Sequence, residues 1–168
     1  MNYHNITHDD MKNGDGLRVV LWVAGCGHHC KNCQNPQTWD PNSGILFDDS
    51  AEKELFTELG KDHISGITFS GGDPCYPGNI DTIVRLMKKA KVLYPKKTIW
   101  VYTGYELTHI KNNLVGWSKD TYAGFLKNVD VLVDGPYIDK LRDTSLHWVG
   151  SSNQNVWRKN GIDFIKDE

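Results

Sequence analysis

Three of the four cysteines in this chain lie within eight residues, at Cys26, Cys30 and Cys33. Because the C-x3-C-x2-C spacing makes a tight loop, the three thiolates can be directed at one point, which suits a soft metal ion or an iron–sulfur cluster. A closed tetrahedral zinc site needs four protein ligands. Three ligands leave one metal position open, and an open position is where a substrate binds and reacts.

The cysteine spacing alone leaves zinc and an iron–sulfur cluster both open. A structural zinc ion could take His28, His29 or Cys75 as its fourth ligand. However, the chain lacks the second cysteine pair of a zinc ribbon, and the loop directly follows a strand that we predict over residues 17–24. These two features favour a cluster. Outside a metal site, we expect both histidines to be solvated and Cys75 to be a small buried residue.

Glycine-containing sequences follow the other predicted strands. Gly71-Gly72-Asp73-Pro74 follows a strand over 64–70, Thr103-Gly104-Tyr105 ends a strand over 98–103, and Asp134-Gly135-Pro136 ends a strand over 129–134. A glycine pair is often only a tight turn, but it also lets a ligand approach the backbone closely. Asp73 would then offer its carboxylate to a cation such as an α-ammonium group. Asp134 ends an apolar run, so a sugar hydroxyl or a cation would satisfy its charge.

The pattern between these strands predicts amphipathic helices. One helix begins near 49–52 with a capping residue, a second begins at Asn79 as cap and stops at Tyr94-Pro95, and two short segments lie near 105–114 and 118–127. Alternating strands and helices indicate a mostly parallel sheet, in which ligands bind beyond the C-terminal strand ends. Residues 1–16 are polar with a turn at 13–16, residues 146–158 give no clear prediction, and the tail after 160 is either a short strand or frayed. We find no domain boundary in 1–168.

Composition excludes several classes of protein. The 168 residues are 39% hydrophobic and 24% charged, with a net charge of −2, which argues against a nucleic-acid surface held by a basic field. No apolar run approaches the roughly 20 residues of a membrane span, and the first residues lack a signal-peptide pattern. Clustered cysteines fit metal ligation in a reducing compartment, so we expect a cytoplasmic protein. The six tryptophans are expected in the core.

Taken together, the cysteine loop and Gly71-Gly72-Asp73-Pro74 resemble the radical S-adenosylmethionine enzymes. The order of further motifs resembles one family within them, the activating proteins of the anaerobic (class III) ribonucleoside-triphosphate reductase. The resemblance covers residues 2–157. The motifs are NGDGLR at 13–18, GC at 25–26, NPQTW at 35–39, SGGDP at 70–74, WVYTGY at 100–105, VLVDGP at 131–136 and GSSNQ at 150–154.

The resemblance implies a [4Fe–4S] cluster held by Cys26, Cys30 and Cys33, with S-adenosylmethionine on the fourth iron. It implies that reductive cleavage gives a 5′-deoxyadenosyl radical, which generates a glycyl radical on the anaerobic reductase. It further implies an incomplete, laterally open (β/α) barrel and a small reductant protein such as a flavodoxin. The residues expected to contact the cofactor are Asn32, Cys33, Gln34, Gly71, Gly72, Asp73, Thr103 and Asp134.

The chain departs from the family pattern at three places. Many relatives have Gly-Pro-Gly where this chain has Gly14-Asp15-Gly16, and Arg where it has Val149. An aromatic residue, often near the adenine, commonly follows the third cysteine, where this chain has Gln34. Two other functions stay open: a small radical enzyme acting on a deazapurine precursor, and a non-enzymatic zinc module that binds a partner.

Overall fold

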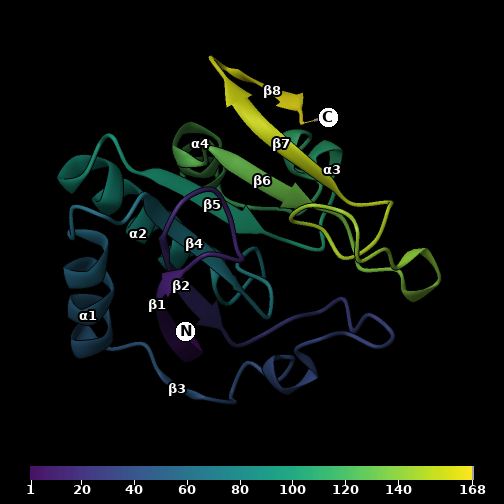
Figure 1. Cartoon of the computed structure of the whole chain (residues 1–168), viewed down its shortest axis with the longest axis horizontal. Coiled ribbons are helices and arrows are strands. Elements are labelled where there is room, and N and C mark those ends of the chain that lie inside the picture. Colours follow the sequence, from purple (N-terminus) through teal and green to yellow (C-terminus); the bar gives the residue numbers. More distant parts are fainter. Residues whose placement is uncertain (168) are drawn as a thin grey trace.

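The computed structural model describes residues 1–167 and contains one mixed sheet with helices against it (Figure 1). The strands are β1 (Asn2–Asp10), β2 (Arg18–Val23), β3 (Ile45–Leu46), β4 (Gly66–Gly71), β5 (Thr98–Tyr102), β6 (Val131–Asp134), β7 (Asn155–Asn160) and β8 (Asp163–Lys166). The helices are α1 (Asp49–Leu59), α2 (Ile80–Leu93), α3 (Leu107–Lys111) and α4 (Lys119–Asn128), with short 3-10 turns at Pro36–Thr38 and Asp139–Leu141.

The sheet has the order β3-β1-β2-β4-β5-β6-β7-β8 and does not close on itself. Its centre, β2-β4-β5-β6, is parallel, as the alternation of strands and helices predicted. Both margins are antiparallel: β1 and β3 flank β2, and β7 and β8 flank β6. In Figure 1 the arrows of β4, β5 and β6 point toward the side of the molecule that holds the cysteine loop and the segment 136–154.

The first sixteen residues contain a strand that the sequence analysis did not predict. Tyr3 and Ile6 of β1 are buried, but the strand has register irregularities between Tyr3 and Asn5 and between Thr7 and Asp10. These irregularities disturb the period-two pattern by which a strand is recognised. At the other end of the chain, β8 settles the open alternative for the tail in favour of a short strand.

Two helix starts differ from the prediction in detail. Asp48, one residue earlier than expected, caps α1 by accepting a hydrogen bond from the Ala51 N–H at 2.9 Å. Asn79 precedes α2 but makes no capping bond. Its side-chain amide instead donates to the carbonyls of Ala24 and Asp73 at 2.8 and 3.1 Å. Asn79 therefore joins the end of β2 to the turn after β4.

Alternate residues of the parallel strands pack into two separate clusters. Ile99, Val101 and Leu132 join the large core that includes the buried faces of the helices, whereas Trp100 and Val131 join a small cluster on the opposite face. The strand period of two produces this division. Trp100 and Trp117 are buried as predicted, but the other four tryptophans are only partly buried.

A buried arginine joins three parallel strands near their N-terminal ends. Arg18 has no exposed surface, and its guanidinium donates to the Thr68 hydroxyl at 2.7 Å and to the carbonyls of Ile67 and Thr98 at 2.8 Å. Burial lowers the pKa of Arg18 to about 10, so the group stays charged at neutral pH. A Cβ at Gly66 would lie 2.0 Å from the Thr98 carbonyl oxygen and 2.7 Å from the guanidinium, which explains glycine there.

Candidate functional site

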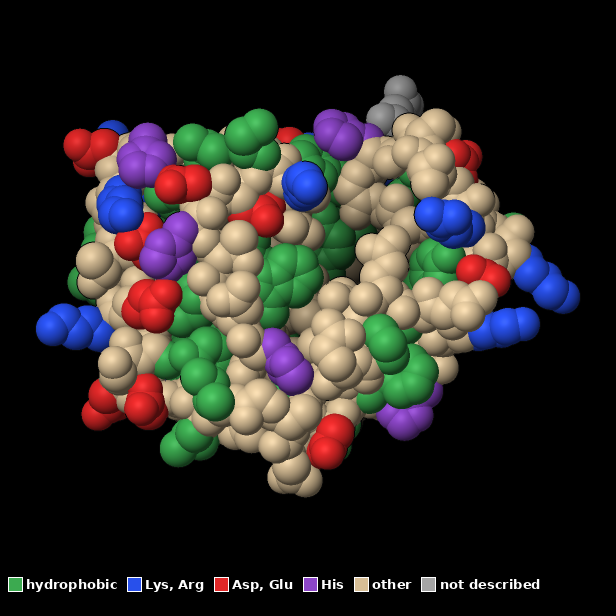
Figure 2. Space-filling view, turned by 60° about the horizontal axis from the view of Figure 1, so that its bottom comes forward, with side chains coloured by type: hydrophobic (Ala, Val, Ile, Leu, Met, Phe, Trp, Pro, Cys, Tyr) green, Lys and Arg blue, Asp and Glu red, His purple; other side chains and the backbone are tan. Residues whose placement is uncertain are grey.

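A cavity of about 400 Å³ opens beyond the C-terminal ends of the parallel strands. Figure 2 shows a hollow in the molecular surface with hydrophobic side chains recessed in it, and acidic and basic side chains interspersed around it. The cavity volume is in the range of small-molecule and cofactor sites. Its walls come from residues within 12–13, 22–35, 70–73, 102–104, 133–137 and 148–154.

Cys26, Cys30 and Cys33 all line this cavity, as the sequence predicted for strand-end residues. Their loop is held at its start, where the N–H groups of Gly25 and Cys26 donate to the carbonyls of Thr38 and Trp39 at 2.7 and 3.1 Å. Cys75 is fully buried and lies outside the cavity wall, in agreement with its expected role as a small core residue.

Two residues of the cysteine loop have a left-handed backbone conformation. His29 and Asn32 have φ angles of 48° and 58°, in the left-handed region that few non-glycine residues adopt. The loop is held at both positions, because the His29 ring stacks on Trp39 at 4.7 Å and the Asn32 amide donates to Asp139 at 2.9 Å. These contacts keep the loop folded over the strand ends.

The three thiols fit a cluster by their chemistry. Burial raises the pKa values of Cys26 and Cys30, and iron bound beside them would favour their thiolate forms. Within residues 1–167, no group of three or more His, Cys, Asp or Glu side chains converges as a site for a metal ion. The fit therefore depends on three soft donors that share one cavity with space for a ligand.

The two glycines after β4 are required by their neighbours. A Cβ at Gly71, whose φ is 102°, would lie 2.7 Å from the backbone N and O of Val23, and one at Gly72 would lie 2.5 Å from the Gly25 carbonyl oxygen. Gly72 and Asp73 also donate their N–H groups to the carbonyls of Val23 and Gly25, both at 2.8 Å. The glycines thus hold the start of the cysteine loop against this turn, and they also line the cavity.

The Asp73 carboxylate lies at the centre of a hydrogen-bond network. It is 1% exposed and accepts hydrogen bonds from the Thr103 hydroxyl at 2.9 and 3.0 Å, the Gly104 N–H at 3.1 Å and the Cys75 N–H at 2.7 Å. His28 Nε2 lies 2.7 Å from its Oδ2 atom. The structure therefore brings Asp73 and Thr103 together, and the expectation of a solvated His28 was wrong. His28 and Asp73 are far apart in sequence, so the sequence analysis could not predict their contact.

Asp134 is satisfied by the protein itself. Its carboxylate accepts from the Leu107 N–H at 2.7 Å and from the backbone and side-chain N–H groups of Asn155 at 3.2 and 3.0 Å. The residue is 2% exposed and is not part of the cavity wall, although Val133 and Gly135 are. These donors replace the sugar hydroxyl or cation that the sequence analysis sought as its partner.

The residues around the third cysteine separate into two groups. Gln34 lines the cavity beside Cys33, whereas Asn32 lies outside the wall and bonds to Asp139. The segment 150–154 also reaches the site: Gln154 accepts from the Gly150 N–H at 2.9 Å and donates to the Gly135 carbonyl at 2.9 Å. Gly150 and Gln154 of this family motif form part of the wall.

Several wall residues were not singled out from the sequence. They are Lys12 in the N-terminal segment, Trp22 within β2, and Tyr137 and Trp148 in the segment after β6. Trp22 could have been found, because it alternates with the buried residues Leu21 and Val23 in β2 and so faces the opposite side.

Residues 12–157 match the family model of the 4Fe-4S single cluster domain. The chain is 43% identical to the anaerobic ribonucleoside-triphosphate reductase-activating protein of Enterobacteria phage T4 over 157 residues, which cover 94% of each chain. It is 40% identical to the protein of that name from Escherichia coli (strain K12), with 93% of this chain and 97% of the relative covered.

These matches and the three-cysteine cavity define a 4Fe–4S protein. More narrowly, the chain belongs to the family of anaerobic ribonucleoside-triphosphate reductase-activating proteins. The family expected from the ordered sequence motifs is therefore confirmed. Within residues 1–167, none of the helices is long and apolar enough to span a membrane.

Proposed function

We propose that this chain activates an anaerobic ribonucleoside-triphosphate reductase by the reductive cleavage of S-adenosylmethionine. The observation that carries the proposal is that three cysteines and the Gly71-Gly72-Asp73 turn line one cavity at the C-terminal ends of parallel strands. When bound, a [4Fe–4S] cluster supplies the electron for cleavage to methionine and a 5′-deoxyadenosyl radical, which takes a hydrogen atom from a glycine Cα of the reductase. The proposal treats residues 1–168 as one activase domain.

The proposal gives the residues of the site different roles. Cys26, Cys30 and Cys33 hold the cluster, and the Gly71-Gly72 backbone with Asp73 faces the methionine end of the cofactor. Thr103 holds the Asp73 carboxylate in place through its hydroxyl. Cys33 and Gln34 line the cavity and would face the nucleotide end of the cofactor. Asn32, which bonds to Asp139, and Asp134, which has internal partners, are left out of the contact set that we propose. The protein thus supplies position and exclusion of water.

The open sheet supports the proposal of a laterally open barrel of the radical S-adenosylmethionine type. Its two antiparallel margins leave the strands unclosed between β3 and β8. A folded reductase must insert a glycine-bearing loop to reach the site, and an opening in the wall allows it. A small reductant protein such as a flavodoxin would deliver the electron, in a reducing compartment such as the cytoplasm that keeps the thiols free for iron.

The test is anaerobic reconstitution with iron and sulfide, followed by measurement of methionine and 5′-deoxyadenosine. With the cognate reductase added, electron paramagnetic resonance should show a glycyl radical. A reduced, cluster-loaded protein that cleaves S-adenosylmethionine but radicalises no reductase would contradict the partner. One colourless zinc ion per chain after anaerobic purification would instead support the binding module, and turnover of a deazapurine precursor would support the small-molecule enzyme.

A further inference from the structure

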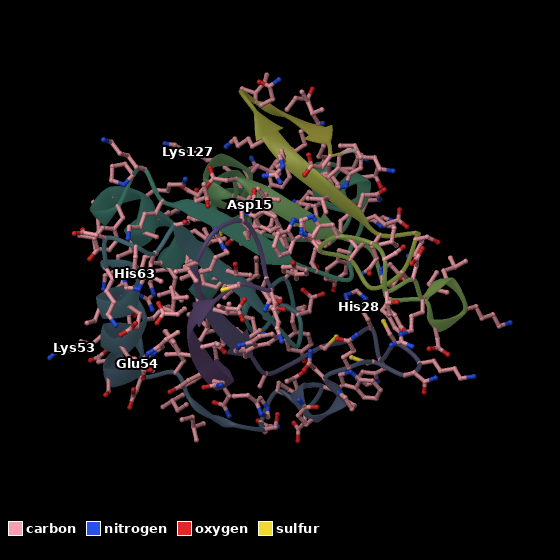
Figure 3. The ribbon with its side chains drawn as sticks, viewed as in Figure 1. Asp15, His28, Lys53, Glu54, His63 and Lys127 are labelled. Atoms are coloured by element: carbon pink, nitrogen blue, oxygen red, sulfur yellow. The ribbon has the colours of Figure 1, made fainter. Side chains whose placement is uncertain are left out.

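The His28 side chain joins the cysteine loop to the turn after β4. It lies between Cys26 and Cys30 in sequence, and its Nε2 atom is 2.7 Å from the Oδ2 atom of Asp73. The His28 side chain is 20% exposed and that of Asp73 is 1% exposed, so the bond is largely shielded from water. Figure 3 shows His28 beside the sulfur atoms of the loop.

Two further residues hold the imidazole in this place. Its ring lies edge-on to Tyr105, with 4.6 Å between the ring centroids. It also occupies the space where residue 104 has no side chain, because a Cβ at Gly104 would lie 2.4 Å from the imidazole Cδ2 atom and 2.6 Å from Nε2. The absence of a side chain at Gly104 therefore makes room for His28.

We propose that His28 is a positioning residue that sets the distance between the cysteine loop and Asp73. The inference rests on the proposed function. There, one small molecule must contact the cluster on the cysteines and the Gly71-Gly72-Asp73 turn together. Among the described residues, the backbone hydrogen bond between the loop and this turn is made at Gly25. Farther along the loop, the Asn32–Asp139 bond leads to a different and exposed segment. The His28–Asp73 bond fixes the part that carries Cys30.

The test compares His28→Leu with His28→Gln, because the glutamine amide places an N–H donor near the position of imidazole Nε2. His63→Leu is the matched control. His63 also forms a 2.7 Å bond to an aspartate, Asp9, but both side chains are more than half exposed, and Figure 3 shows His63 beside α1, far from His28. All variants are reconstituted anaerobically and checked for equal iron and sulfide.

The first readout is equilibrium binding of S-adenosylmethionine, followed by the change it causes in the paramagnetic spectrum of the reduced cluster. Loss of a hydrogen bond to a charged group should raise the Kd of His28→Leu roughly tenfold. His28→Gln should stay within about twofold of the parent, as should His63→Leu. Gly104→Ala, which displaces the imidazole without removing it, should weaken binding in the same direction as His28→Leu.

The second readout uses the metal-free chain and does not depend on the proposed function. Trypsin cleavage after Lys31, an exposed residue within the loop, measures local opening of that loop. It should be faster in His28→Leu and unchanged in His28→Gln and His63→Leu. Unchanged cofactor binding or unchanged cleavage at Lys31 in His28→Leu would overturn the inference. Failure of the parent to bind or cleave S-adenosylmethionine would instead overturn the proposed function.

Discussion

The two faces of the parallel strands differ in what they contact. One face is apolar and packs against α1, α2 and α4 in the large core. The other face carries Arg18, Ser70, Trp100 and Tyr102. Its residues nearest the C-terminal strand ends, Ser70 and Tyr102, line the cavity. Adjacent residues of a strand point to opposite faces. Alternate residues of the same strands therefore face either the packed core or the cavity. Substitutions on the two faces should have separable effects on stability and on cofactor chemistry.

The largest difference between an effect on activity and an effect on stability is expected for substitutions of the cysteines. Replacement of Cys26, Cys30 or Cys33 by alanine should reduce formation of 5′-deoxyadenosine to background, because the remaining two thiolates cannot hold the cluster. Cys75→Ala is the matched control, since Cys75 is buried outside the cavity wall. It should retain the cluster and its activity at a cost of about 1 kcal/mol in the free energy of unfolding. Loss of the cluster in Cys75→Ala would show that the ligand set is wrong.

The helix-covered face should respond in the opposite way. Leu55 of α1 has no exposed surface, so Leu55→Ala should lower the free energy of unfolding by about 2–5 kcal/mol through lost burial and a cavity. Leu114→Ala, at a position that is 69% exposed, should change it by about 0.5 kcal/mol or less. Urea titration measures both. Binding of S-adenosylmethionine by folded Leu55→Ala should match the parent, and a weakened affinity would show that the two faces are coupled.

The cavity face has its own structural residue in Arg18. Arg18→Met should destabilise the metal-free chain by about 2–3 kcal/mol, because the buried carbonyls of Ile67 and Thr98 lose their donor. Arg18 and Arg158 both lie over the Trp100 ring, at 5.5 and 5.4 Å from its centroid, but the Arg158 side chain is 38% exposed. Arg158→Met should therefore cost less than about 1 kcal/mol. Equal losses in the two variants would mean that stacking on Trp100, rather than the buried hydrogen bonds, accounts for the contribution of Arg18.

The contrast between faces also explains what the sequence could predict. The four parallel strands and α2 were predictable because their apolar residues recur with clear periods. β3 and β8 are short edge strands with exposed residues, and β1 has an irregular register. None of these three strands therefore has apolar residues that recur with a clear period. The cysteines and the Gly71-Gly72-Asp73 turn were predictable because each follows one of the clear strands.

Pairs of residues far apart in the chain were not predictable in this way. His28 and Asp73 are 45 residues apart, and Arg18 and Thr98 are 80 apart. A histidine in a loop and an arginine at a strand start have ordinary exposed alternatives, so only the folded arrangement identifies their partners. Asp134 illustrates the reverse case: its buried carboxylate was recognised, but its donors come from Leu107 and Asn155 rather than from a ligand.

The smallest effect is expected for an ion pair between α1 and α2, two of the helices that cover the apolar face of the sheet. Glu52 of α1 accepts from the Arg85 guanidinium at 2.7 and 3.1 Å and from the Lys89 ammonium at 2.7 Å. The hydrogen bonds from Arg85, followed by that from Lys89, lower the pKa of Glu52 to about 2. Since Arg85 and Lys89 are 54% and 44% exposed, solvent screening reduces the contribution of the pair to about 1 kcal/mol.

Glu52→Gln should therefore lower the free energy of unfolding by about 1 kcal/mol at neutral pH. A carboxyl whose pKa is lower in the folded chain stabilises it above the unfolded pKa of about 4.3, and this contribution is lost as the pH falls toward 2. The difference between parent and variant should be constant from pH 7 to 5 and shrink below about 4.5. Urea titration at each pH measures it, with Glu54→Gln, whose exposed partner is His8, as the control. A difference in the free energy of unfolding that persists unchanged at pH 3 would assign the effect to packing rather than charge. Altered binding of S-adenosylmethionine by Glu52→Gln at neutral pH would show that the helix-covered face influences the site.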